Sequence, residues 1–247
     1  MKAWQVVSLG KRVLGRGIIC VAGGVAMLKM GPMVMMALSM FISIAVYAVA
    51  FGLKFALGFV LLLFAHEYGH LVASRVVGLK VSSPIFIPFV GAVIRIKELP
   101  LNVKMEANVA IGGPAMGTLS ALFCLAIYFW TNSMLMLVLS YTACLLNLFN
   151  LIPCDPLDGG RIAAAISPRL WWLGSMVIGV LFVYTYNVFV LIILVFSLFR
   201  LWQGNDIQNN LLYYQLTAGQ RLTVGWWYFG LIIVLSGTTL YIIGILN

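Results

Sequence analysis

Ala65-His66-Glu67-Tyr68-Gly69-His70 places two imidazoles and a carboxylate inside one of the most apolar parts of the chain. Leu57 to Phe64 before it and Leu71 to Ala73 after it contain no charged side chain. A charge at the centre of a membrane helix costs roughly 2.5–3.5 kcal/mol on insertion scales, so a residue of this kind is by default functional. The stretch therefore indicates a site within a membrane segment.

The spacing of the two histidines is that of a metal-binding helix. His66 and His70 are the only histidines in 247 residues, and they are four positions apart. On a helix they share one face, where both can bind a single zinc ion, and Glu67 beside them can act as a general base. The alternative is a hydrogen-bonded pair of structural histidines. Tyr68 is interpreted as a neutral packing residue.

The composition predicts an integral membrane protein. Hydrophobic residues make up 63% of the chain and charged residues 9%, with a mean hydropathy of +1.09. A soluble domain of this size could not bury so much apolar surface. No polar stretch is long enough to form a second folded domain, so one multi-pass domain is expected.

The net charge of +9 does not predict nucleic-acid binding. The basic residues are spread between hydrophobic segments instead of forming a patch with interleaved polar and aromatic residues. They fit the excess of Lys and Arg in cytoplasmic loops. The basic N-terminus lacks a compact apolar run followed by a cleavage site, so it is interpreted as mature cytoplasmic sequence. We expect a multi-pass protein of a prokaryotic cell membrane, with the lipid bilayer as a partner and no nucleic acid.

The four cysteines are isolated from one another. They lie singly in mostly apolar surroundings, without C-x-x-C spacing. We interpret them as small packing residues and predict no disulfide framework. They are Cys20, Cys124, Cys144 and Cys154.

A helix needs roughly 20 apolar residues to cross a hydrocarbon core of about 30 Å. Apolar segments of about this length therefore predict the membrane crossings. The clearest are 31–51, 56–77, 108–130, 134–152 and 223–246. The apolar segment 171–199 is too long for one upright transmembrane helix and rather short for two full membrane crossings. A turn at Asn187 would make it a hairpin, and two crossings there would place every basic residue except Lys54 on one side.

The predicted fold class is an all-α integral membrane protein with six or seven transmembrane helices and a short re-entrant β-hairpin or loop. That hairpin is expected within residues 81–100, where Pro84, Pro88 and Gly91 oppose a helix and β-branched residues dominate. The expected organisation is a cytoplasmic or interfacial segment at 1–30, an intramembrane core at 31–200, and an interfacial loop with the last transmembrane helix at 201–247.

Two histidines leave a zinc ion short of ligands, because catalytic sites usually take three from the protein. Candidates for the third cluster in Asn150-Leu151-Ile152-Pro153-Cys154-Asp155-Pro156-Leu157-Asp158-Gly159-Gly160. Cys154, Asp155 and Asp158 each carry a suitable atom, and Asp158 could alternatively cap a helix. In the preceding segment, Asn147 is interpreted as packing or bonding within the bundle.

At this point the chain resembles the site-2 protease family of intramembrane zinc metalloproteases. The resemblance lies in His66 to His70 together with the second motif, Asn150-x-x-Pro153-x-x-x-Leu157-Asp158-Gly159. Phe86 to Gly91 and Gly113-Pro114 also resemble the family's re-entrant loop and the helix after it. The resemblance covers roughly residues 30–200, and it is to a compact form, without an inserted PDZ-like domain or a C-terminal regulatory domain.

This resemblance implies a zinc-dependent endopeptidase that hydrolyses peptide bonds in or near the transmembrane segment of another membrane protein. It implies His66, His70 and Asp158 as ligands of one Zn²⁺ ion and Glu67 as the catalytic base. Asn150 would donate a hydrogen bond to the substrate backbone or to the developing oxyanion.

Two further expectations concern neighbouring segments. Gly113 and Gly117 form a G-x-x-x-G step, which is interpreted as close helix packing instead of a direct substrate contact. Residues 92–97, where Ile94 and Ile96 alternate with charged residues, are expected to form an exposed strand that pairs with an extended substrate.

Two other functions compete with a protease. A metal-ion or proton-coupled transporter would also place His and Asp in a membrane, but it is expected to show internal repeats or paired broken helices, which the sequence lacks. A catalytically inactive relative would be expected to lack Glu67, which is present.

Overall fold

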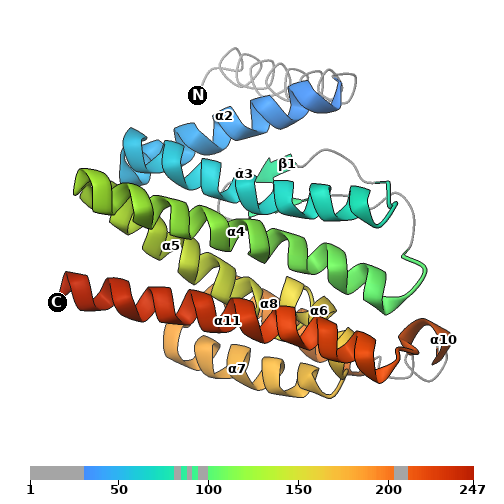
Figure 1. The fold of residues 1–247 in the computed structure, drawn as a ribbon. Helices are drawn as coiled ribbons and strands as arrows, with labels where there is room; N and C mark the ends of the chain where they lie inside the picture. Colours follow the sequence, from blue (N-terminus) through green and yellow to red (C-terminus); the bar gives the residue numbers. More distant parts are fainter. Residues whose placement is uncertain (1–30, 81–84, 88–90, 94–99, 203–210) are drawn as a thin grey trace, which may run out of the picture.

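Helices account for most of the chain in the computed structural model, which describes residues 31–80, 85–87, 91–93, 100–202 and 211–247 (Figure 1). The predicted N-terminal segment, Cys20 and part of the predicted interfacial loop lie outside these residues. The helices are α2 (Pro32–Phe51), α3 (Leu53–Val76), α4 (Val103–Thr131), α5 (Met134–Asn150), α6 (Asp158–Ile166), α7 (Leu170–Thr185), α8 (Val188–Trp202), α10 (Leu211–Tyr214) and α11 (Ala218–Leu246).

Four of these helices, α2, α3, α4 and α11, are long and apolar enough to cross a membrane. Three others, α5, α7 and α8, are apolar but have fewer than 18 residues. The predicted mainly helical class is confirmed, with four candidate membrane-spanning helices among the described residues. Six or seven crossings stay a prediction, because it depends on how the three shorter helices lie in the bilayer.

Polar caps explain where two helices begin earlier than predicted. Helix α4 begins at Val103 instead of Asn108, since the Asn102 side chain accepts a hydrogen bond from the Met105 backbone N–H at 2.9 Å. Helix α11 begins at Ala218 instead of Thr223, after a capping box formed by Thr217 and Gln220. The length of an apolar segment does not predict where such a helix begins, because the first turns of the helix are polar.

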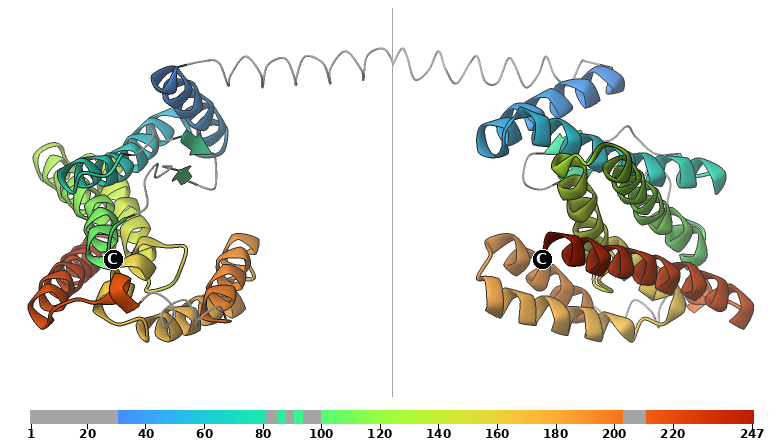
Figure 2. Two further views of the ribbon diagram at one scale, coloured as in Figure 1. Left: turned by 90° about the vertical axis from the view of Figure 1, so that its right-hand side faces the viewer. Right: turned by 60° about the vertical axis from the view of Figure 1, so that its left-hand side comes forward.

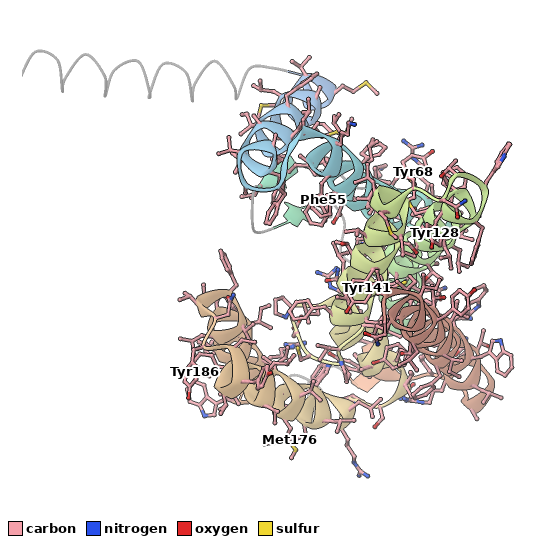
Figure 3. The ribbon with its side chains drawn as sticks, turned by 90° about the vertical axis from the view of Figure 1, so that its left-hand side faces the viewer. Phe55, Tyr68, Tyr128, Tyr141, Met176 and Tyr186 are labelled. Carbon is pink, nitrogen blue, oxygen red and sulfur yellow. The ribbon has the colours of Figure 1, made fainter. Side chains whose placement is uncertain are left out.

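Residues 171–199 form the predicted helical hairpin. Helices α7 and α8 pack against each other. The turn between them has Tyr186 in the left-handed region, with φ of 49°, and the Asn187 side chain accepts from the Phe189 N–H at 2.8 Å. Tyr186 at the turn and Met176 on α7 are both exposed on the outside of the bundle (Figure 3).

An antiparallel strand pair, β1 (Ile85–Ile87) and β2 (Gly91–Val93), lies beside α2 and α3. Phe86 is buried, its ring lies 6.3 Å from that of Phe64, and its backbone N–H donates to the Ser39 hydroxyl on α2. This places β1 against α2. The charged part of the predicted strand, residues 94–97, lies outside the described residues.

Helix α4 is the centre of the bundle. It packs against α3 on one side and against α5 and α6 on the other, and α11 covers α4, α5 and α6 (Figure 1). The strand pair and the α7–α8 hairpin extend from this centre on the same side (Figure 2). Gly69 of α3 and Gly112 of α4 meet backbone to backbone, since a Cβ on either would overlap the other's carbonyl group. The backbones of the two helices are therefore in contact within the H-E-x-x-H segment.

Basic side chains lie at one end of the bundle. Helix α3 ends there, and α4 and α11 begin there (Figure 1). Arg75, Lys104 and Arg221 belong to these helix ends, whereas Lys54 lies in the first turn of α3 at the other end. This arrangement agrees with the predicted one-sided distribution of charge, and the cytoplasmic assignment of that side stays a prediction.

Candidate metal centre

The structure brings together the three side chains that were predicted as metal ligands. His66 and His70 on α3 and Asp158 on α6 direct one atom each to a common point. The Asp158 Oδ2 lies 3.2 Å from the Nε2 of His66 and 3.2 Å from the Nε2 of His70. The two Nε2 atoms are also 3.2 Å apart. Among the described residues, these three are the cluster of histidine, cysteine and acidic side chains that could hold one metal ion.

Their spacing and chemistry fit zinc. Tetrahedral ligands at about 2.0–2.1 Å from zinc stand about 3.3–3.4 Å from one another, close to the observed separations. Two imidazoles and one carboxylate also form a donor set of the catalytic kind, with three protein ligands. The site is largely shielded from solvent, since the exposed fractions of the His66, His70 and Asp158 side chains are 5%, 13% and 15%.

Helix geometry and two hydrogen bonds orient the imidazoles. The four-residue spacing puts both rings on one face of α3, 4.8 Å apart and nearly perpendicular. The Nδ1 of His66 bonds to the Asn147 Oδ1 and the Nδ1 of His70 to the Val109 carbonyl, both at 2.8 Å. Because both Nδ1 atoms face these oxygens, both Nε2 atoms are directed toward Asp158.

Asp158 is held by the tight start of α6. It is the first helical residue after Leu157, and its carboxylate contacts the imidazoles instead of capping the helix. A Cβ on Gly159 would overlap the Leu151 and Ile152 carbonyls, and the Gly160 carbonyl accepts from the Trp171 indole N–H at 2.7 Å. Burial alone would raise the pKa of Asp158, but the neighbouring imidazoles lower it overall, so the carboxylate stays ionised.

The rival third ligands are directed elsewhere. Cys154 is fully buried, and its burial together with the charge of Asp155 raises the pKa of the thiol to about 12. Its thiol is not among the atoms that converge with the two imidazoles, whose third partner is Asp158. Asp155 instead pairs with Arg200 at 3.3 Å, and Arg200 also lies 5.1 Å from the Trp171 ring centre.

Part of the chain is similar in sequence to known peptidases. Residues 54–134 match the sequence model described as Peptidase family M50. This part of the chain is similar to peptidase family M50. A zinc metalloprotease of the archaeon Methanocaldococcus jannaschii is 34% identical over 106 residues, which cover 41% of this chain and 30% of the relative. The chain therefore aligns with less than a third of that relative's length.

The matched segment spans α3 and α4 and carries His66, Glu67 and His70, but it ends before Asp158. The placement of Asp158 is thus an independent observation of the structure. Glu67 is buried on α3 directly after His66, with 9% of its surface exposed. Asn150 is half-buried at the end of α5, one helical turn beyond Asn147.

The predicted close helix packing at the G-x-x-x-G step is confirmed, and it lies directly against His66, His70 and Asn147. A Cβ on Gly113 would overlap the imidazole of His70 and crowd that of His66, and a Cβ on Gly117 would overlap the amide of Asn147. The absence of these two side chains lets α4 support the rings from one side. Sequence reasoning attributed Gly113 and Gly117 to helix packing without locating the partner side chains.

Asn147 is the residue of the site that sequence reasoning assigned to ordinary packing. It lies 81 positions from His66 and is almost fully buried. The signal that could have indicated it is a polar side chain within the apolar α5, one helical turn before the motif residue Asn150.

Proposed function

We propose that this protein is a zinc-dependent intramembrane endopeptidase of the site-2 protease kind. The observation that carries the proposal is the triangle of His66 Nε2, His70 Nε2 and Asp158 Oδ2, with sides of 3.2 Å. It is supported by the M50 match over the helix that bears the histidines. His66, His70 and Asp158 would hold one zinc ion, which when bound activates water and polarises a peptide carbonyl.

Glu67 and Asn150 complete the chemistry. Glu67 would take a proton from the attacking water and return it to the leaving amine, the usual role of the glutamate in this helical motif. Asn150 would donate its amide N–H to the substrate backbone or to the oxyanion that develops on the scissile carbonyl. The buried position of Glu67 keeps competing bulk water away from this proton transfer.

A substrate inside the bilayer would be a membrane protein with a transmembrane segment. The four long apolar helices support a membrane protein, and Gly69 to His70 lie in the half of α3 that ends at the basic side. We assign that side to the cytoplasm of a prokaryotic cell, with the N-terminus on the same side.

The strand pair offers a way to hold such a substrate. A helical substrate hides its peptide bonds, so it must become extended before cleavage, and an extended peptide can add to a strand edge. Phe86 of β1 contacts Phe64 on α3, and β2 also contacts α3, so the strand pair packs on the helix that carries both histidines. Because β1 packs on α2, the edge of β2 that faces away from β1 is the proposed pairing edge.

A transporter is the competing function, since it too would place histidines and an aspartate in a membrane. It is not favoured, because the protease homologue and the M50 match both indicate hydrolysis.

The deciding experiment is Glu67→Gln in the full-length protein, with zinc content and cleavage of a model transmembrane substrate both measured. We expect zinc content near that of the wild type and cleavage lowered by at least 10²-fold, the lower end of general-base contributions. Glu106→Gln is the matched control, because Glu106 bonds to Tyr213 on another helix and should keep cleavage. Full cleavage by Glu67→Gln would exclude Glu67 as the base.

A further inference from the structure

The orientation of His66 depends on the Asn147 amide, and the hydrogen bonds define which atoms donate. Asn147 Nδ2 donates to the Ala143 carbonyl at 2.7 Å, and this oxygen can only accept. The Asn147 Oδ1 must therefore face His66, where it accepts from the Nδ1–H at 2.8 Å. With the proton on Nδ1, the Nε2 of His66 keeps its lone pair for a metal ion.

The two imidazoles differ in what holds them. His70 donates from Nδ1 to a backbone carbonyl, that of Val109. His66 is oriented by a side chain, which a single substitution can change. The hydrogen bond partner of a zinc-bound histidine fixes its ring orientation, and loss of such a partner typically costs 10–100-fold in metal affinity or activity.

Asn147 has no freedom to turn toward a substrate. One per cent of its surface is exposed, and its amide donates and accepts within the bundle. Helix α4 holds it from the other side, because Gly117 has no Cβ to displace the amide. A direct role in binding the substrate is thus left to Asn150, which lies one turn closer to the loop.

We infer that Asn147 is the positioning residue of the metal centre, because it fixes the ring orientation and the tautomer of His66 for zinc binding. Gly117 acts through Asn147, since the absence of its side chain leaves room for the Asn147 amide. This inference rests on the proposed function, since it takes His66 as a zinc ligand. It adds two residues, from α5 and α4, to a site whose ligands come from α3 and α6.

The first test measures zinc affinity by chelator competition on the full-length protein in detergent. Asn147→Leu, which keeps the volume but removes the acceptor, is expected to bind zinc about 10–100-fold more weakly. Asn147→Asp, which keeps an acceptor for the Nδ1–H, should recover most of the affinity. Ser140→Ala is the matched control, since Ser140 is buried on the same helix and bonds to Ala121. Equal affinity of Asn147→Leu and wild type would overturn the inference.

Gly117 is tested by a double-mutant cycle. Gly117→Ala should weaken zinc binding in the wild-type background but have no further effect in Asn147→Ala, whose short side chain leaves room for the added methyl group. Additive losses would show that Gly117 acts independently of Asn147.

A spectroscopic test of the role of Asn147 does not depend on the measured zinc affinity. Since the chain has two histidines, ¹⁵N-histidine labelling of the zinc-loaded protein gives two imidazole rings. Asn147→Leu should change one Nδ1–H signal, that of His66, and leave the signal of His70 unchanged. Loss of both signals, or of neither, contradicts a specific positioning role. A wild type that binds no zinc would instead refute the proposed function, which keeps the two failures distinguishable.

Discussion

At the residue scale, the sequence identified the atoms that converge and missed the one that orients them. His66, Glu67 and His70 are recognisable because their spacing is local, and Asp158 because its motif is local too. The hydrogen bond of Asn147 with His66 joins residues 81 positions apart, and no local pattern encodes such a contact. Its polarity within an apolar helix marked it as unusual without naming its partner.

Asp158 and Cys154 give opposite expectations for metal binding. Asp158→Asn should abolish tight zinc binding, because the amide replaces the charged oxygen that contacts both imidazoles. Cys154→Ala should keep the zinc affinity of the wild type, since Cys154 packs with Leu157 and Ile178 and lies outside the cluster of His66, His70 and Asp158. Zinc content after dialysis and gel filtration measures both. Loss of zinc in Cys154→Ala together with retention in Asp158→Asn would reverse the assignment of the third ligand.

At the element scale, the lengths of the apolar segments predicted where the long helices lie. They did not predict the polar first turns of these helices or the pairing of the strands. The turn at Asn187 was predictable because a single polar residue divides a long apolar segment, and the structure confirms two helices there. The close contact of α4 with the imidazoles was only partly predictable. A pattern of small residues indicates that another helix approaches closely, and it does not tell which side chains fill the space.

The register of the strand pair makes a substrate-pairing test possible. Phe86 and Ala92 are opposite each other, and the Phe86 N–H is directed to Ser39 instead of to β2. The two residues therefore form a non-hydrogen-bonded pair, in which the Ala92 N–H points away from β1. Ala92→Pro removes that donor and should lower cleavage at least several-fold with unchanged zinc content.

Ala92→Val is the control for this strand substitution, because it enlarges the side chain and keeps the N–H. Cleavage rates in detergent or liposomes, with zinc content measured in parallel, decide the outcome. If Ala92→Pro cleaves as fast as Ala92→Val, substrate does not pair with β2 through this group.

At the scale of the whole molecule, α4 connects both halves of the metal centre. It packs on α3, which carries the histidines, and on α6, which carries Asp158. The M50 match covers the first of these halves and stops before the second. The mainly helical class and the three side chains that converge could thus be predicted from local motifs. The arrangement of the α7–α8 hairpin and the strand pair on one side of the bundle required the structure (Figure 2).

Zinc should stabilise the entire fold because its ligands belong to two helices. A ligand that binds the native state at a hundred times its Kd adds about 2.7 kcal/mol to the free energy of unfolding. We expect added zinc to raise the unfolding temperature of the wild type by several degrees and to leave that of Asp158→Asn unchanged. Thermal unfolding in detergent, with and without a chelator, measures the shift. An equal rise in both proteins would place the stabilising zinc elsewhere.

The separation of the two ligand-bearing helices along the chain has a consequence for biosynthesis. A ribosome adds about 5–20 residues per second, so α3 enters the membrane several seconds before α6 is made. During that interval the nascent chain already carries the histidines and the glutamate, but without Asp158 it has no third ligand. If the protein has the proposed protease activity, an incomplete chain could not cleave neighbouring proteins at the site of insertion, and activity would begin only when the loop after α5 folds back onto α3.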